Sequence, residues 1–309
     1  MLTFILERIF GLIPVLLGVS LLVFALTWLA PGDPVMALVG ESAQGISREA
    51  LEDLRRSYGL DRPLLVQYWD YLRAALRGDL GRSLRSGLDV AEEIAMRFPA
   101  TLRLTLAGMA VAVVLGLSLG LLAAIYRRTL IDYLAIVLAL IGVSVPVFWS
   151  GLLMMLLFSL ELAWLPASGS GSWRHLVMPA FAIGFASSAF IARITRSSMI
   201  EVLRHDYVRT ARAKGLVPWQ VNVKHAFRNA LLPVVTVVGL QFGSLLGGAV
   251  LTETVFAYPG IGRMLVDAIR ARDLPLIQGT VLFVSVVFVL INLLVDISYA
   301  ALNPKIRYE

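Results

Sequence analysis

Six long apolar runs divide the chain, and polar or charged segments separate each run from the next. A helix that spans a bilayer needs about 20 mainly apolar residues. Six stretches reach that length, at approximately 9–30, 101–126, 131–160, 176–195, 231–254 and 279–302. The pattern predicts an all-α membrane protein with six transmembrane helices. The third run is long enough to be tilted or broken, and Pro146 is the expected break.

Composition supports a membrane setting. The 309 residues are 58% hydrophobic, and the mean hydropathy is +0.80, whereas a soluble domain is about 45–50% apolar. Soluble folding would leave too much apolar surface in water. The apolar core of a signal peptide is about 7–15 residues long. The first run is longer and is followed by Pro-Gly-Asp-Pro, so we expect a retained transmembrane helix.

The basic residues predict the orientation. The net charge of +6 is concentrated in short loops between apolar runs, which suits membrane orientation better than nucleic-acid binding. With six spans, one side carries Arg8, Arg127, Arg128, the 193–228 stretch, Lys305 and Arg307, and the other carries Arg174, Arg263, Arg270 and Arg272. This bias predicts that both termini and the loop 196–230 lie in the cytoplasm.

The segment 31–100, between the first two spans, is expected to be extracytoplasmic and helical. Ser47 suits the N-cap of one helix, and Pro63 the first turn of another. The first would carry Leu51, Leu54 and Tyr58 on one face and end at Gly59; the second would carry Leu65, Trp69, Leu72 and Leu76. Asp89 and Glu92 resemble a capping box. The segment could lie on the bilayer surface as an interfacial cap, or it could offer a docking platform to an external partner. The two roles are compatible with each other.

Three parts follow from this organisation: a first transmembrane helix at 1–30, the extracytoplasmic segment 31–100, and a five-helix core at 101–309.

Within the core, the segment 201–233 is the most charged. Residues 200–214 favour a helix, Gly215 suits a left-handed residue that ends it, and Pro218 suits the first turn of the next helix. The simplest interpretation is a basic loop that touches anionic lipid.

The fifth span has a face of small residues. Gly239, Gly243 and Gly247 form a GxxxGxxxG stripe, and Gln241 and Ser244 add polarity to the same span. Such a stripe allows the close approach of another helix backbone. It predicts either packing within the subunit or a subunit interface that lines a pathway. The single GxxxG of Gly116 and Gly120 in the second span indicates packing.

Four ionisable residues fall in or near the spans and are candidates for a functional role. Arg103, Arg193 and Glu253 lie near predicted span ends, where their side chains could reach water. Asp296 lies deeper, on the same helical face as Asn292. It could pair with an arginine or lie near the cytoplasmic end.

The chain lacks the residue patterns of an enzyme. It has no cysteine, its three histidines are scattered, and it contains neither H-E-x-x-H, a P-loop nor G-x-S-x-G. We therefore expect no catalytic residues, no metal site and no cofactor in this chain, and disfavour an intramembrane enzyme. If transport here uses ATP, another chain must hydrolyse it.

The loop 196–230 contains a recognisable motif. Thr-Ala-x-x-x-Gly at 210–215 is followed, after nine residues, by His-Ala-x-Arg-Asn-x-x-x-Pro at 225–233. This resembles the EAA loop of ABC importer permeases, whose coupling helices dock into a groove on the ATPase subunit. Arg209, where the motif has Glu, and His225, where Ile is usual, resemble the dipeptide, oligopeptide, nickel and glutathione branch. The resemblance implies ATPase-coupling roles for Asp206, Tyr207, Arg209, Thr210, Ala211, Arg212, Lys214, Gly215 and His225.

The resemblance extends over nearly the whole chain, through motifs such as YGLDRPLLVQYW, GDLGRSL, GVSVPVFW, AWLPASG and VFAYPGIGRMLVDAI. It implies a type I importer-like, multi-pass permease subunit of the bacterial inner membrane, with di- or oligopeptides or glutathione as cargo, and nickel or a metal chelate as the alternative. The implied partners are a homologous permease, two ATPases that bind ATP and Mg, an extracytoplasmic solute-binding protein and membrane lipid, with no nucleic acid. The rival class is a stand-alone secondary transporter, which would favour inverted repeats or paired broken helices.

Overall fold

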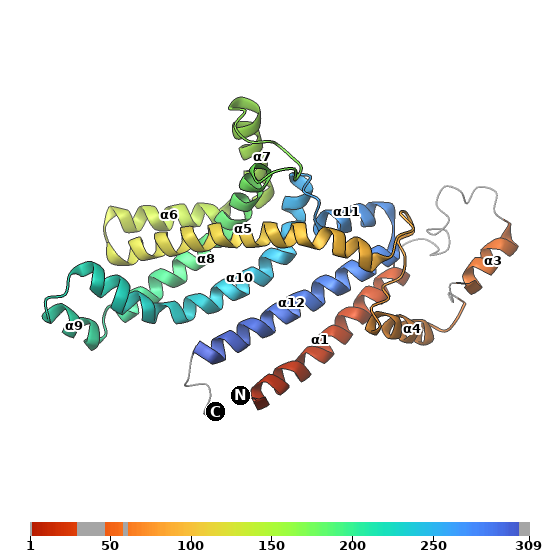
Figure 1. The fold of residues 1–309 in the computed structure, drawn as a ribbon, viewed down its shortest axis with the longest axis horizontal. Coiled ribbons are helices and arrows are strands. Elements are labelled where there is room, and N and C mark those ends of the chain that lie inside the picture. The colour runs from red at the N-terminus through yellow and green to blue at the C-terminus, as the bar shows by residue number, and fades with distance from the viewer. Residues whose placement is uncertain (1, 30–46, 58–60, 303–309) are drawn as a thin grey trace.

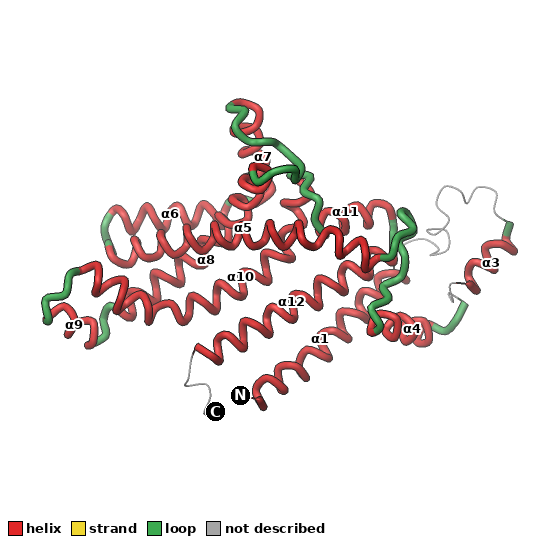
Figure 2. Tube along the Cα trace, in the orientation of Figure 1, coloured by secondary structure: helices red, strands yellow, loops and turns green. Residues whose placement is uncertain are grey.

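The computed structural model describes residues 2–29, 47–57 and 61–302. This part of the chain is helical with connecting loops, and its only extended pairing is an isolated bridge between Arg82 and Asp89. Figure 2 separates the helices from the loops. The helices are α1 (Leu2–Leu29), α3 (Arg48–Ser57), α4 (Leu64–Leu76), α5 (Val90–Ile125), α6 (Leu130–Ser144), α7 (Val147–Met154), the π-helix η2 (Met155–Glu161), α8 (Arg174–Val202), α9 (Asp206–Ala213), the π-helix η3 (Gln220–Phe227), α10 (Arg228–Val255), α11 (Ile261–Ala271) and α12 (Leu274–Leu302).

The long helices form a bundle in which α8 packs against α5, α6 and α10, and α12 lies between α10 and α1 (Figure 1). Glycines allow α5 and α8 to approach closely. A Cβ atom on Gly116 would lie 2.6 Å from the Cβ of Ile191, and one on Gly120 would lie 2.5 Å from the carbonyl oxygen of Ala192. The packing role predicted for these two glycines is therefore confirmed.

Four helical segments in the described ranges are long and apolar enough to cross a membrane: Val90–Ile125, Arg174–Val202, Gln220–Val255 and Leu274–Ser298. A fifth results if α6 and the α7–η2 pair form one span, which bends by 100° at Pro146. The predicted break at this proline is confirmed. In α1 the described apolar stretch, Phe10–Ala25, is shorter. The predicted count of six spans stays a prediction.

Beyond Pro146, α7 and η2 leave the direction of α6 and project from the bundle (Figure 1). Their inner side packs against Met178 and Ala182 of α8 and against Phe256, which follows α10. The other side of this arm is apolar and open, with Trp149, Leu156 and Leu160 at 48%, 50% and 73% exposure. An arm of this kind suits a hydrocarbon or protein environment rather than water.

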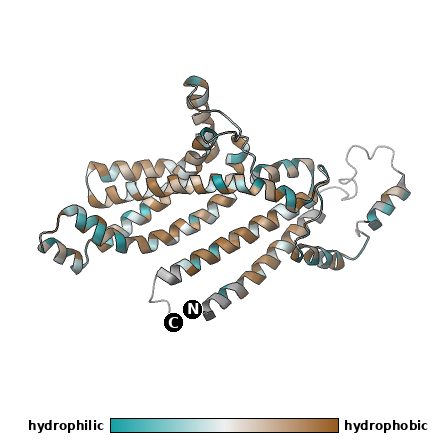
Figure 3. Ribbon diagram, in the orientation of Figure 1, coloured by the Kyte–Doolittle hydropathy of each residue, from teal (hydrophilic) through white to brown (hydrophobic). Residues whose placement is uncertain are grey.

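The two ends of the bundle differ in composition. The α5–α6 turn, α9, the start of α1 and the end of α12 lie toward one end, whereas α4, α11 and the loop 77–89 lie toward the other (Figure 1). Figure 3 shows the hydrophilic α9 region beside predominantly hydrophobic long helices. The described segments with the predicted cytoplasmic charge bias thus share an end, and Lys305 and Arg307 lie outside the described residues. Which side of the membrane that end faces stays a prediction, as do the boundaries of the three parts.

The segment before α5 corrects one expectation. Ser47 caps α3 as predicted, because its Oγ accepts a hydrogen bond from the Ala50 N–H at 3.2 Å, and α4 follows Pro63 as predicted. The capping box at Asp89 is wrong. Asp89 makes no side-chain cap to α5, because its carboxylate binds Arg82 at 3.0 Å instead. The Leu54 side chain, Tyr58 and Gly59 lie outside what the structure describes.

Helix α4 turns its predicted apolar stripe outward. Leu65, Trp69 and Leu76 are 83%, 51% and 81% exposed, and Leu72 is half-buried. An adjoining face meets α1 through Tyr68 and Tyr71. The Tyr68 hydroxyl lies 2.8 Å from the Ser20 hydroxyl, and both tyrosine rings contact Phe24. Burial raises the pKa of Tyr71 to about 12. An exposed apolar stripe beside a span is typical of a helix that lies at a bilayer surface.

Candidate functional site

The loop 196–230 folds as a helix, a glycine turn and a second helix. Helix α8 continues to Val202, a short turn follows, and α9 covers Asp206–Ala213. The expected single helix over 200–214 is therefore interrupted. Gly215 has φ +77°, as predicted for the residue that ends a helix in the left-handed region. A new helical turn begins at Pro218, also as predicted.

Helix α9 has one buried and one exposed face. Val208 and Ala211 are buried, in an apolar cluster with Met199 of α8 and Val221, Ala226 and Ala230 of the following helix. The outward residues are Asp206, Tyr207, Arg209, Thr210, Arg212 and Lys214. Arg209 and Asp206 form an ion pair at 3.6 Å, but their side chains are 76% and 96% exposed, so it adds little stability. We call this outward side, together with Gly215, the α9 surface.

A polar contact joins α9 to the next helix. The Asn229 Nδ2 donates hydrogen bonds to the Tyr207 hydroxyl and to the His225 carbonyl, each at 2.9 Å. The His205 ring stacks on the Tyr207 ring, with centroids 5.9 Å apart. Asn229 was not among the residues selected from sequence, although the Arg-Asn pair of the motif could have indicated it. His225 takes part in this contact through its backbone carbonyl, and a sequence motif of side chains does not predict a backbone contact of this kind.

The residues that precede Asn229 form η3, a π-helix over Gln220–Phe227. In a π-helix hydrogen bonds run from i to i+5, and such segments are uncommon and frequent at functional sites. The wider turn joins the α9 surface to the span formed by α10. The surface is therefore held by an apolar base, by Asn229 and by a non-standard helical turn.

The glycine stripe of α10 is divided between two environments. A Cβ on Gly243 would lie 3.2 Å from the ring of Phe288 of α12, and Gly239 faces Val295 of the same helix. These two glycines pack within the subunit. No atom lies within 4 Å of a Cβ built on Gly247, and Ser244 is exposed, whereas Gln241 is half-buried. The open part of the stripe is thus Ser244 and Gly247.

Two ion pairs involve ionisable residues of the spans. Arg196 of α8 binds Asp132 of α6 through Nε at 2.8 Å and Nη2 at 2.9 Å, and the Asp132 side chain is 3% exposed. Neither residue was among those selected from the sequence, although an acid in the first turn of a span was a signal. Asp296 pairs with Arg8 at 3.2 Å, in line with the predicted arginine partner. Arg103 and Arg193 are exposed.

Glu253 is fully buried, and therefore does not reach water as its position near a span end had suggested. Its carboxylate accepts hydrogen bonds from the Thr101 hydroxyl at 2.6 Å and the Arg263 N–H at 3.1 Å. Thr101 Oγ1 in turn accepts from the Ile261 N–H at 2.9 Å. The first turn of α11 is in this way joined to α5 and α10.

A bundle of apolar helices with a cationic surface at one end is typical of a multi-pass membrane protein. Comparison with known protein families also indicates a membrane protein. Residues 116–308 match the family described as "Binding-protein-dependent transport system inner membrane component", and residues 1–105 match the N-terminal family of the same transport system membrane components.

Relatives cover the whole chain. It is 47% identical over 309 residues to the glutathione transport system permease protein GsiC of Escherichia coli, and 48% identical to that of Salmonella typhimurium, with complete coverage of both chains in each case. Among solved structures, the inward-facing MetNI methionine ABC transporter matches with a TM-score of 0.60 at 17% identity, over 68% of this chain and 96% of that one. An amino acid ABC transporter matches with a TM-score of 0.51 at 15% identity, over 69% and 94%.

The chain therefore belongs to the binding-protein-dependent ABC importer permeases, in their dipeptide/oligopeptide family. The predicted family, the multi-pass inner-membrane localisation and the non-enzymatic transport class are confirmed by these relatives. The structural matches support the fold alone. Neither the coupling roles of the α9 residues nor the pathway role of the α10 stripe is tested by them, so both stay predictions.

Proposed function

We propose that this chain is one of two permease subunits in an ATP-driven importer for glutathione or for di- and oligopeptides. The cargo proposal is supported by full-length relatives whose names specify glutathione transport. The proposed partners are a homologous permease, two ATPases that bind ATP and Mg, and an extracytoplasmic solute-binding protein. This chain contributes half of the translocation pathway and a docking surface for an ATPase, and needs no cofactor of its own.

One observation carries the coupling proposal. The α9 surface presents three cationic residues outward, Arg209, Arg212 and Lys214, and the exposed Arg204 precedes it. Val208 and Ala211 are buried in the apolar cluster beneath it. A short helix that is fixed to a bundle on one side and exposed on the other can transmit a push to the bundle. Electrostatic complementarity to an acidic groove would fix its orientation on the ATPase.

In the proposed mechanism, ATP-driven closure of the ATPases moves the loops 196–230 of both permeases. The two bundles then rock, and a central cavity alternates between inward and outward access. The contacts of the loop must differ in free energy between the two states, because a contact that is equal in both shifts no equilibrium. The link from Tyr207 through Asn229 to η3 gives such a change a route from α9 to α10.

We also propose that α10 contributes to the pathway or to the interface with the second permease. Ser244 and Gly247 are the part of its stripe that is open to a neighbour. Gln241 adds a polar group that could meet cargo or the partner. Gly239 and Gly243 would support this role indirectly, because they bring α12 close behind the exposed face.

Purification of the complex tests the proposal. A tag on this chain, mild detergent and mass spectrometry of the co-purifying proteins should recover a homologous permease and ATPases. The complex, reconstituted in liposomes with its binding protein, should take up labelled glutathione or dipeptide only with ATP. Uptake of nickel or a metal chelate instead would support the alternative cargo. ATP-independent transport by this chain alone would overturn the importer proposal in favour of a secondary transporter.

A further inference from the structure

An apolar groove lies between α5, α6 and α8, along the part of α8 that leads toward α9 (Figure 1). Its volume is about 430 Å³, within the range of about 300–1,000 Å³ that is common for small-molecule sites. Small buried residues line it, namely Ala135 and Ala139 of α6 and Ala189 of α8. Leu140 and Phe190 also line it and are exposed. The groove is therefore open to the outside of the subunit.

The groove has one polar end. Its polar lining residues are Arg193, Arg196 and Ser197, and on α8 all three follow the apolar lining residues in the direction of α9. The α5–α6 turn, with the exposed Arg127 and Arg128, lies toward the same end of the bundle. The other described residues that line the groove are apolar. This division matches an amphiphile with an apolar tail and a polar head.

The polar end has a cation whose charge is not balanced. Arg196 binds Asp132 through contacts at 2.8 Å and 2.9 Å, which balances its charge. Arg193 is exposed, and within the described ranges it makes no hydrogen bond or ion pair. Its guanidinium lies 5.7 Å from the centroid of the Phe190 ring, another lining residue. No carboxylate is among the described residues that line the groove, so the polar end suits an anion.

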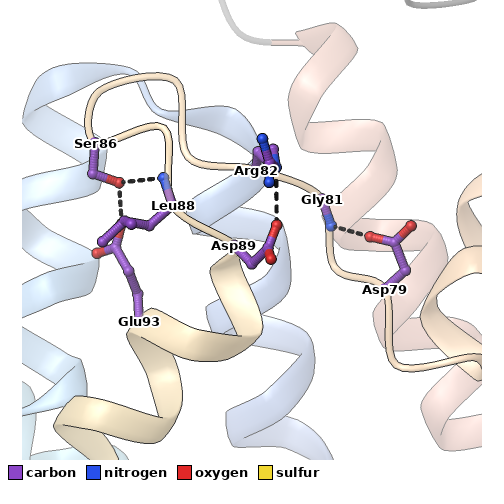
Figure 4. Close-up of polar contacts among 7 residues, drawn as sticks. All are labelled: Asp79, Gly81, Arg82, Ser86, Leu88, Asp89 and Glu93. Atoms are coloured by element: carbon purple, nitrogen blue, oxygen red, sulfur yellow. Dashed lines mark hydrogen bonds and ion pairs between the residues drawn. The ribbon is translucent and has the colours of Figure 1, made fainter.

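Other arginines beside the long helices have partners within the chain. Arg82, which precedes α5, pairs with Asp89 at 3.0 Å (Figure 4). Arg193 instead has free donors beside an apolar groove. A guanidinium presents a planar set of N–H donors that matches the oxygens of a phosphate group. Ser197 lies four residues further along α8, on the same helical face, and its exposed hydroxyl adds another donor.

The length of the groove matches one leaflet of a bilayer. Its lining on α6 extends from Ala135 to Val143, which is about 12 Å at a rise of 1.5 Å per residue. The hydrocarbon of one leaflet is about 15 Å thick, half of the bilayer core. Arg193 and Arg196 lie at the end of the apolar run 176–195, where long cationic side chains reach the head groups. A peptide fits less well, because the apolar lining offers its N–H and C=O groups no partners.

We propose that this groove holds an acyl chain of an anionic phospholipid, with the lipid phosphate bound by Arg193 and Ser197. Basic pockets between transmembrane helices bind anionic head groups in this way. The lipid joins α6 to α8 beside the Asp132–Arg196 pair and so stabilises this side of the bundle. The inference depends on the membrane location of the chain, and is independent of the cargo and of the coupling role of α9.

The test uses the complete transporter in liposomes that contain phosphatidylglycerol with a photoreactive diazirine in one acyl chain. Mass spectrometry of the digested protein measures the label on residues 119–143 and 189–197. Arg193→Gln should lower this label about fivefold, the effect of one cation on an anionic lipid, whereas Arg193→Lys should stay within about twofold because it keeps the charge. Arg127→Gln is the matched control, an exposed arginine at the same end that does not line the groove, and should change the label little.

A second pair of variants tests the site of the acyl chain. Val143 and Val137 of α6 are both 50% exposed, but only Val143 lines the groove. Val143→Phe places a ring where the chain would lie and should lower the label severalfold. Val137→Phe adds the same volume outside the groove and should leave the label unchanged. Equal labelling of these two variants would contradict the proposed position of the chain.

Other outcomes would also overturn the inference. An equal loss of label in Arg127→Gln and Arg193→Gln would indicate general attraction to the membrane surface. Equal labelling by photoreactive phosphatidylcholine would indicate an apolar site that does not recognise anionic lipid. Loss of label on addition of glutathione or dipeptide would indicate cargo in the groove, and label on the isolated chain but not on the complete transporter would indicate a partner subunit there. Each of these results leaves the importer proposal, which uptake tests, unaffected.

Discussion

The side-chain amide of Asn229 donates a hydrogen bond to the Tyr207 hydroxyl at 2.9 Å, and so joins α9 to the start of α10. The same amide binds the His225 carbonyl at the end of η3. The two contacts lie where the proposed ATPase-docking helix meets the span that it is expected to move.

Removal of this amide should weaken coupling. Asn229→Ala eliminates both hydrogen bonds, each worth about 0.5–1.5 kcal/mol, while the buried base of Val208 and Ala211 remains. We expect severalfold lower uptake per ATP hydrolysed in proteoliposomes, with normal assembly. Tyr207→Phe removes one of the two bonds and should have a smaller effect. Wild-type stoichiometry in Asn229→Ala would contradict a role for this link.

Substitution of Gly215 tests the turn that follows α9. No atom lies within 4 Å of a Cβ at this position, so space is not limiting, but φ is +77°. A left-handed conformation costs an L-residue roughly 1–2 kcal/mol, and asparagine tolerates it better than valine. Gly215→Val should therefore uncouple ATP hydrolysis from uptake without preventing assembly, and Gly215→Asn should retain most uptake. Normal uptake by the valine variant would reject the proposed role of this turn.

Disruption of the Asp132–Arg196 pair should destabilise the bundle. Asp132→Asn leaves the Arg196 guanidinium, which is 29% exposed, without its bidentate partner. Loss of one partner of a buried pair typically costs about 3–5 kcal/mol. We expect a clearly lower thermal midpoint of the purified complex. The apolar pair Asp132→Leu/Arg196→Met should recover part of the loss, whereas Arg193→Gln, which has no ion pair among the described residues, should change the midpoint little.

The junction at Glu253 should control how firmly α11 is attached. Glu253→Gln replaces one acceptor oxygen by an amide donor, which faces the Thr101 hydroxyl or the Arg263 N–H. A buried donor that loses its acceptor costs about 1–3 kcal/mol. We expect faster amide hydrogen exchange in residues 261–271. Thr101→Ser keeps the hydroxyl and serves as the control, with exchange close to that of the original chain.

Several features of the fold were predictable because they depend on local chemistry. The apolar runs located the long helices, and Pro146, Pro218 and Gly215 located a break, a start and an end, as their restricted or permissive backbones require. Ser47 identified a cap because its hydroxyl oxygen can accept from a free backbone N–H in the first turn. The motif in the loop 196–230 led to the family that the full-length relatives confirm.

The remaining features depend on contacts between distant parts of the chain. Asp132 and Arg196 are 64 residues apart, and Thr101 and Glu253 are 152 apart, so no local pattern couples them. Asp89 has good capping chemistry, but tertiary structure places Arg82 beside it. Likewise, the glycine stripe of α10 indicated a close approach, whereas the packing of Phe288 and Val295 shows that α12 occupies part of it.

The π-helical turn η3 has a consequence for how this permease can vary. A π-turn contains more residues than an α-turn, so deletion of one residue from Gln220–Phe227 could return the segment to α-geometry without breaking the helix. Each residue of an α-helix corresponds to about 100° of rotation. Because the wider turn absorbs its extra residue, such a deletion would keep the α9 surface on the same side of α10, whereas the loss of one residue from the regular α-helical part of α10 would turn that surface by this angle.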